Sequence, residues 1–203
     1  MGDKGRRERP LSREELFDRA LAIADAEGLE ALSMRRLARD AGVEAASLYH
    51  HLPNKSALLD GMVARMRSEM RLPDPLPADW RELLLAIFLE YRRILAAHPN
   101  LMSLAGRRVE TDPDSGLLYL IRLGFKEEEA VELWQSLIAF TVGFSVFSST
   151  YADSDVSDLP PALAARMSEW REGTCRRTLG AILEAYDSGR PRIRRRRPPG
   201  TRG

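Results

Sequence analysis

Apolar residues recur at intervals of three and four along most of the chain, and this spacing predicts helices almost throughout. The first such run shares one helical face and consists of Leu16, Phe17, Ala20, Leu21 and Ile23. Ser12 and Glu15 precede it with the S-x-x-E spacing of a capping box, and Gly28 follows it. No segment alternates apolar and polar residues long enough to predict a sheet. The pattern therefore predicts an all-α protein.

Three further helices are expected before residue 71, each with a recognisable start or end. Ser33 can cap a second helix that stops at Gly42. A third, short helix is expected over residues 45–51, and Asn54 can cap a fourth that presents an apolar face as far as Met66.

The stretch LPDPLPAD, residues 72–79, holds three prolines and is the best boundary in the sequence. The helices expected beyond it span residues 79–98, 112–124, 126–150 and 160–186. Asp112 and Pro113 provide the start of the second of these. Gly173 could break the last one, and residues 152–158 are expected to form a polar loop.

Residues 33–55, SMRRLARDAGVEAASLYHHLPNK, have the layout of a helix-turn-helix. Small Ala38 allows two helices to cross closely, and apolar Val43 and Leu48 would hold the second helix against the first. The residues left facing outward are Ala45, Ala46, Ser47, Tyr49, His50 and His51. The second helix of such a motif lies in the major groove of DNA.

Phosphate-binding groups flank this motif on both sides. A helix N-terminus and basic side chains are suited to phosphate contacts. The residues that supply them are Ser33, Arg35, Arg36 and Lys55. The pattern therefore predicts that this region binds double-stranded DNA.

The segment Leu32–Met70, with its spacing G-V-x-x-x-x-L-Y-x-H-x-x-N-K-x-x-L-L, resembles the DNA-binding domain of the tetracycline-repressor (TetR) family. A weaker likeness continues in LGFKEEEAVELWQSLIAFTVGF and RTLGAILEAY, which resemble helices of the family's C-terminal domain. The resemblance implies a three-helix DNA-binding domain followed by a larger helical ligand-binding and dimerisation domain. The expected divisions are a basic arm (1–11), the DNA-binding domain (12–71), the larger domain (72–189) and a tail (190–203).

The resemblance also implies a function: a homodimeric transcriptional regulator, most often a repressor that a small molecule releases from a palindromic operator. By position, Arg35 matches a residue that reaches base edges, and Lys55 matches one that binds a phosphate. Residues at the leading positions of the recognition helix are Ala45, Ala46 and Ser47, and those matching phosphate and groove contacts are Tyr49, His50 and His51.

Two departures from the family pattern change these expectations. Ala45 and Ala46 cannot donate hydrogen bonds to bases, so direct readout would come from Arg35, Ser47 or His50. Tetracycline-binding members use a histidine in the region of 101–106 to hold the drug-bound metal, and LMSLAG contains none. The effector is therefore expected to be a different small molecule.

Candidate ligand contacts beyond the linker are mostly aromatic. They are Phe88, Tyr91, His98, Met102, Phe125, Trp134, Phe140 and Phe144. An aromatic stripe at helical spacing suits a protein core as well as a pocket. His98 precedes Pro99, and the alternative for it is a helix-end histidine that interacts with the helix dipole.

Enzymatic, metal and membrane functions find little support. The chain lacks the motifs of phosphate-binding loops, zinc proteases, serine hydrolases and dinucleotide-binding enzymes. The adjacent His50 and His51 diverge by about 100° on a helix, which argues against a shared metal, and no cofactor is expected.

Cys175 is the single cysteine. The longest strongly apolar stretch, 137–147, is too short to span a bilayer, and no signal peptide is recognisable, so a cytoplasmic protein is expected.

Two other functions compete with a regulator: a helical ligand-binding or enzymatic protein, and an architectural DNA-binding protein without a ligand. Net charge does not decide between them. The total of +1 combines +1 for residues 1–72, −7 for 73–189 and +7 for 190–203. The Arg-rich tail is too polar to fold alone and is expected to be disordered. The helix-turn-helix window itself carries only +2.

Overall fold

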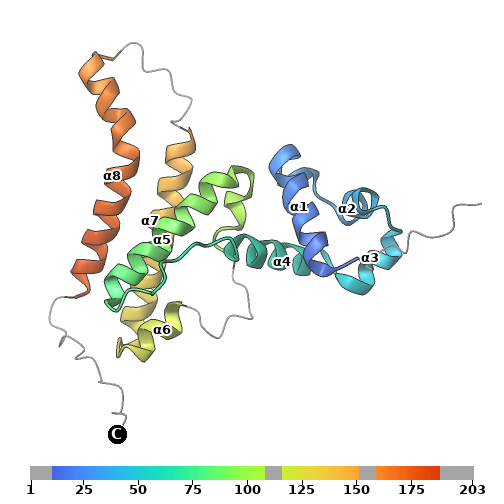
Figure 1. The fold of residues 1–203 in the computed structure, drawn as a ribbon, viewed down its shortest axis with the longest axis horizontal. Helices are drawn as coiled ribbons and strands as arrows, with labels where there is room; N and C mark the ends of the chain where they lie inside the picture. The colour runs from blue at the N-terminus through green and yellow to red at the C-terminus, as the bar shows by residue number, and fades with distance from the viewer. Residues whose placement is uncertain (1–10, 108–115, 151–158, 188–203) are drawn as a thin grey trace, which may run out of the picture.

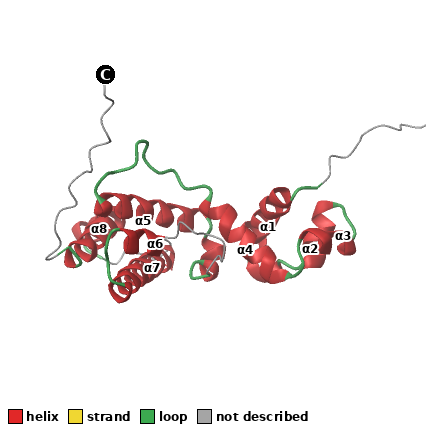
Figure 2. Cartoon of the chain, turned by 90° about the horizontal axis from the view of Figure 1, so that it is seen from below, coloured by secondary structure: helices red, strands yellow, loops and turns green. Residues whose placement is uncertain are grey.

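The computed structural model describes residues 11–107, 116–150 and 159–187, and the side chains of 167–172 lie outside this description. The basic arm, the start of a helix at Asp112, the polar loop at 152–158 and the Arg-rich tail therefore fall outside the described residues. Every regular element in the described part is a helix, as the sequence predicts (Figures 1 and 2).

The N-terminal unit, here called the head, lies at one end of the molecule (Figure 1). Its elements are α1 (Arg13–Glu27), the short 3-10 helix η1 (Leu29–Ala31), α2 (Met34–Ala41), α3 (Ala45–His51) and α4 (Lys55–Arg67). Both views place α4 between the other head helices and the rest of the protein. The chain therefore passes from α4 to the body, and α1 contacts the body as well, through η2.

The remaining helices form the body. They are α5 (Trp80–Ala97), the 3-10 helix η2 (Pro99–Leu104), α6 (Gly116–Arg122), α7 (Glu127–Thr150) and α8 (Pro161–Ala185). Helix α5 packs against both α7 and α8, which also pack against each other. Helix α8 continues through Gly173, where the sequence allowed a break.

Side-chain caps fix where the head helices begin. The capping box at α1 is complete: Ser12 Oγ accepts from Glu15 N at 3.1 Å, and Glu15 Oε2 accepts from Ser12 N at 3.0 Å. Asn54 Oδ1 accepts from Ala57 N at 2.9 Å at the start of α4. A cap of this kind stabilises a protein by about 1 kcal/mol. These contacts confirm the helix starts predicted at Ser12 and Asn54.

The core of the head extends past the proline-rich linker. Its centre is made of fully buried leucines of α1 to α4 and of the turns between them, among them Leu16, Leu37 and Leu58. Three body residues belong to the same cluster: Ile94 from α5, and Leu101 and Leu104 from η2. The end of α5 and η2 are therefore packed into the head core, although both follow the linker in the sequence.

Helix α7 has the length expected from the sequence, but its apolar part extends beyond the stretch 137–147. Over an 18-residue window its mean hydropathy is 1.5, so by length and composition alone it could cross a membrane. It also packs against α5, α6 and α8, and one of its faces buries Leu133, Leu137 and Phe144. In this fold α7 is a core helix of the body.

Candidate nucleic-acid interface

A tight left-handed turn at Gly42 sets the angle between α2 and α3. Gly42 has φ 69° and ψ 26°, a conformation that a residue with a Cβ adopts only under strain. Its N–H donates to carbonyls at the end of α2, and Val43 N donates to Ala38 O at 3.0 Å. These bonds end α2 and direct the chain into α3, which confirms the helix-turn-helix geometry expected here.

Helix α3 is held to the head along one side and exposed along the other. Leu48 is fully buried in the head core. Ala45 is partly buried against that core, whereas Ala46, Ser47 and His50 are exposed. Tyr49 has half of its surface exposed (51%). His51 is half-buried. The outward positions of α3 therefore present a hydroxyl, an imidazole and a phenol at one surface.

The basic residues of α2 differ in their freedom to contact DNA. Arg36 pairs with Glu27 at 2.6 Å and with Asp40 at 3.4 Å, and the hydrogen bond from Glu27 raises the pKa of its guanidinium. The side chains of Arg35 and Arg39 are exposed, and neither makes a hydrogen bond or ion pair in the described part of the chain. Arg36 is thus already bound within the head, whereas Arg35 is available.

Two helix N-termini lie beside α3. The Ser33 hydroxyl accepts from Arg36 N at 3.1 Å, so it is occupied as the cap of α2. Lys55 is the first residue of α4, and its side chain is exposed. A helix N-terminus with a free lysine is well suited to a phosphate.

Glu44 was not singled out from the sequence. It occupies the N-cap position of α3, makes no side-chain cap hydrogen bond and is exposed. A carboxylate at the leading end of a recognition helix can accept from the amino group of cytosine. The signal in the sequence was its place directly before the outward residues of α3.

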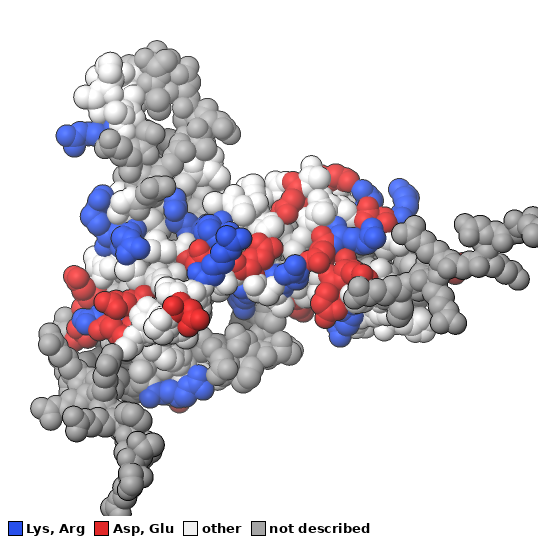
Figure 3. All heavy atoms as spheres, in the orientation of Figure 1, with Lys and Arg blue, Asp and Glu red and all other residues white. Residues whose placement is uncertain are grey.

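Charges of both signs mix on the surface of the head. In the face drawn in Figure 3, acidic and basic side chains alternate over this end of the molecule, without one continuous basic patch. This matches the small net charge of the helix-turn-helix window. Any DNA contact would therefore depend on individual side chains more than on a broad electrostatic attraction.

Most of the candidate ligand contacts gather in the body core. Phe88 and Trp134 meet edge-to-face with ring centroids 5.2 Å apart, and Phe140 lies 5.6 Å from Phe144. The Tyr91 hydroxyl donates to Ala105 O at 2.6 Å, and burial raises the pKa of this phenol. Six of the predicted ligand contacts belong to the body core cluster, here called the aromatic cluster: Phe88, Tyr91, Phe125, Trp134, Phe140 and Phe144. Trp80, which the sequence did not single out, joins them by an edge-to-face contact with Phe125.

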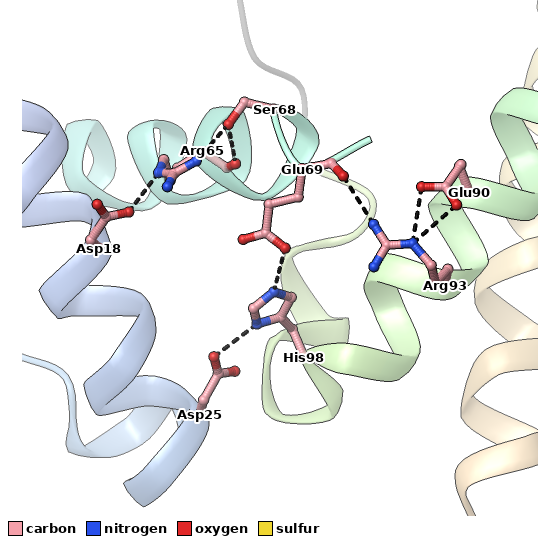
Figure 4. A network of polar contacts seen from close by, with 8 residues as sticks. All are labelled: Asp18, Asp25, Arg65, Ser68, Glu69, Glu90, Arg93 and His98. Carbon is pink, nitrogen blue, oxygen red and sulfur yellow. Dashed lines mark hydrogen bonds and ion pairs between the residues drawn. The ribbon is translucent and has the colours of Figure 1, made fainter. Parts of the chain in front are cut away.

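Two candidates lie away from that cluster. Met102 is half-buried in η2. His98 ends α5, and its ring contacts two carboxylates, Asp25 of α1 and Glu69 beyond α4 (Figure 4). Its side chain thus reaches the head, which the sequence could not indicate.

The described residues contain no group of three potential metal-ligating side chains. Cys175 is buried in the body core, and this burial raises the pKa of its thiol. A thiol with a raised pKa is a poor nucleophile at neutral pH.

Comparison with known proteins gives consistent results. The sequence pattern described as "Bacterial regulatory proteins, tetR family" matches residues 16–62. The tetracycline repressor protein class A from transposon 1721 of Escherichia coli is 30% identical over 180 residues, which cover 85% of this chain and 79% of that protein.

Two solved structures share the fold. A TetR of Acinetobacter baumannii AYE in complex with minocycline superposes with a TM-score of 0.71 at 22% identity, over 91% of this chain and all of that one. The TetR family protein ActR of Streptomyces coelicolor in complex with (S)-DNPA superposes with a TM-score of 0.65 at 29% identity, over 90% of this chain and all of that one.

Proposed function

The chain belongs to the TetR family of bacterial regulatory proteins, as a ligand-responsive DNA-binding transcriptional repressor, and we propose how it performs this role. It binds a palindromic operator as a homodimer, and a small effector bound in the body releases it. The observation that carries the proposal is the exposed face of α3 beside the Gly42 turn. No catalytic role is proposed, because the relatives are transcriptional regulators.

The proposed operator contacts are of two kinds, contacts to base edges and contacts to the phosphate backbone. Arg35 and Ser47 read base edges, together with His50, while the two alanines of α3 pack against thymine methyl groups. Tyr49 and Lys55 fix the head on the phosphate backbone. The remaining phosphate contacts of this proposal come from Ser33, Arg36 and His51. Arg36 would leave Asp40, its longer and weaker partner, to reach a phosphate.

Dimerisation is proposed through α7 and α8, as a four-helix bundle with the same helices of a second copy. Val131 and Val146 on α7 and Leu163 on α8 are exposed large apolar residues in the described part of the chain. Gly143 has open space around it, which would allow close approach of another helix. The two recognition helices would then lie about 34–36 Å apart, or a multiple of this.

The effector is proposed to be an apolar or amphipathic small molecule bound among the aromatic residues of the body. Phe88, Trp134 and Phe140 are the central contacts of this proposal, because all three belong to one core cluster and Phe88 meets Trp134 edge-to-face. ActR, which is 28% identical to this chain, was solved in complex with actinorhodin, and this supports a small-molecule effector. Coupling of 1–3 kcal/mol between effector and operator is typical of such regulators.

The direct test is selection of binding sites from random duplexes by the purified protein, followed by footprinting. We expect a short palindrome and a dimer by light scattering. Binding indifferent to sequence at every salt concentration would instead identify an architectural DNA-binding protein. Because the proposed operator is DNA inside the cell, the same proposal implies a cytoplasmic protein.

A further inference from the structure

The head and body are joined by polar contacts as well as by the shared core, and these contacts come from the segment that follows α5. Arg107 Nε donates to Asp60 Oδ1 at 2.5 Å, in the first half of α4. His98 contacts Asp25 in α1 and Glu69 beyond the end of α4. This segment therefore holds α4 near both of its ends.

His98 is the centre of the second contact, which Figure 4 shows in full. Its Nδ1 lies 2.8 Å from Asp25 Oδ2, and its Nε2 lies 3.3 Å from Glu69 Oε2. Only 12% of the His98 side chain is exposed. Each ring nitrogen thus faces a carboxylate oxygen, one from α1 and the other from the turn that follows α4.

A neutral imidazole cannot satisfy both contacts as a donor. It carries one N–H and one lone pair, whereas the imidazolium carries two N–H donors. In the neutral form one of the two carboxylates would face a lone pair, which weakens that side of the contact. Asp25 Oδ1 is buried without a hydrogen-bond partner, so this carboxylate depends on His98 for compensation of its charge.

The surroundings of His98 add charges of both signs. Arg93 on α5 donates to the Glu69 carbonyl oxygen at 2.9 Å and pairs with Glu90, and Asn100 donates to the Asp25 carbonyl oxygen. On the head side, Arg65 of α4 is paired with Asp18 of α1. Helix α7, which also packs against η2, has no charged residue after Glu132. Asp25 and Glu69 are therefore the two charges in direct contact with the ring.

We propose that His98 is a positioning residue that couples the operator-binding head to the body, and that the charge on its ring sets how firmly the head keeps this orientation. Histidine is the side chain that ordinarily changes charge between pH 5 and 8. The contact has a donor on each side when the ring is protonated and loses one of the two donors when the ring is neutral. Protons are thus a second input to operator binding, beside the effector of the proposed function on which this inference rests.

The test compares the wild-type protein with His98→Gln on the duplex that the wild-type protein selects. Operator affinity is measured by fluorescence anisotropy between about pH 5.5 and pH 8 at constant ionic strength. His50 and His51 are present in both proteins, so their effect on operator affinity is common to both and drops out of the ratio of the two affinities. We expect this ratio to change by about threefold or more across the range, because the two states of His98 differ in the contacts they make.

Two further variants make the outcome specific. Asp25→Asn removes one carboxylate without changing the size of the side chain. The double variant His98→Gln, Asp25→Asn should lose no more of the pH dependence of operator affinity than either single variant. Arg65→Gln is the matched control: it removes the Arg65–Asp18 pair, which lies within the head, and its affinity ratio should stay flat with pH. Circular dichroism at both pH limits establishes that each variant is folded.

A ratio for His98→Gln that is flat with pH overturns the proposal. Should His98→Gln fail to fold, Asp25→Asn provides the same comparison, and a flat ratio there overturns it equally. Failure of the wild-type protein to select any duplex is a different result, which contradicts the proposed operator binding itself.

Discussion

The head and the body are both helical, yet they use their side chains in different ways. In the head, short-range devices fix each helix: a capping box, a left-handed glycine and a side-chain cap at Asn54. These devices leave one exposed face on α3. In the body, long helices pack through large aromatic and aliphatic residues, with few side-chain caps. In our proposal the head recognises DNA through a few exposed side chains, whereas the body recognises its effector through the shape of a packed interior.

The largest effect should come from the body core. Phe88 is almost fully buried and packs edge-to-face on Trp134. Replacing it with alanine removes a large buried ring, so Phe88→Ala should lower the free energy of unfolding by about 3–5 kcal/mol in urea denaturation. Phe88→Leu keeps much of the volume and should cost clearly less. A loss below about 1 kcal/mol for the alanine variant would show that this core is not tightly packed.

Tyr49→Ala should show the opposite behaviour in the head. Tyr49 is half exposed, so its removal should leave the dimer and its stability intact. Gel shift on the selected operator should show binding reduced by about 5- to 150-fold, because one good DNA contact contributes about 1–3 kcal/mol. Tyr49→Phe separates the hydroxyl from the ring. Unchanged affinity in the alanine variant would remove α3 from the interface.

Adjacent arginines on α2 allow a closer comparison within the head. Arg35 is unpaired in the described structure, so Arg35→Ala should lower operator affinity by about tenfold and relax base specificity at one position. Arg36→Ala should lower operator affinity less than Arg35→Ala and equally for every sequence, because Arg36 would reach only a phosphate and would first have to leave Asp40. Competition binding checks the two. Loss of base specificity in Arg36→Ala, with none in Arg35→Ala, would mean that Arg36 reaches the bases instead.

Lys55→Ala should weaken binding to every sequence alike. A lysine at a helix N-terminus contacts a phosphate, which carries no base information. The slope of log affinity against log salt should therefore fall by about one unit, and the ranking of operator variants should not change. A changed ranking would indicate that Lys55 takes part in base readout.

The smallest effect on stability should come from Asp79, whose side chain caps the start of α5 in the described structure. Asp79 accepts from Arg81 N at 2.8 Å, and its hydrogen bonds with Arg81 lower the pKa of its carboxyl to about 2. A lowered pKa adds stability that is present above pH 4 and is lost as pH falls towards 2. Asp79→Ala should cost about 1 kcal/mol at neutral pH and little at pH 2. A cost that does not change with pH would contradict this.

The same difference explains how far the sequence could predict the structure. The starts of α1 and α4, the turn at Gly42 and the extent of α3 depend on residues three to five positions apart, and all were predictable. The partners of His98 lie 73 and 29 residues away, so no local pattern could indicate them. Burial of Leu101 in the head core likewise depends on how α5 meets α4.

Site residues follow the same division. The exposed positions of α3 follow from helical periodicity around the buried Leu48. The engagement of Arg36 by Glu27 could not be predicted, because these residues lie on different helices whose crossing angle only the fold provides. In the body, periodicity places Phe88 and Trp134 on inward faces, but it cannot separate a core residue from one that lines a ligand site.

We propose that a few exposed side chains of the head, rather than net charge, make this protein a sequence-specific repressor. The ratio of its affinities for the selected palindrome and for a scrambled duplex of equal length, at about 150 mM salt, tests this. We expect a ratio of about 10³ or more, as for other specific DNA-binding proteins. A ratio near one, with strong salt dependence on both duplexes, would contradict it.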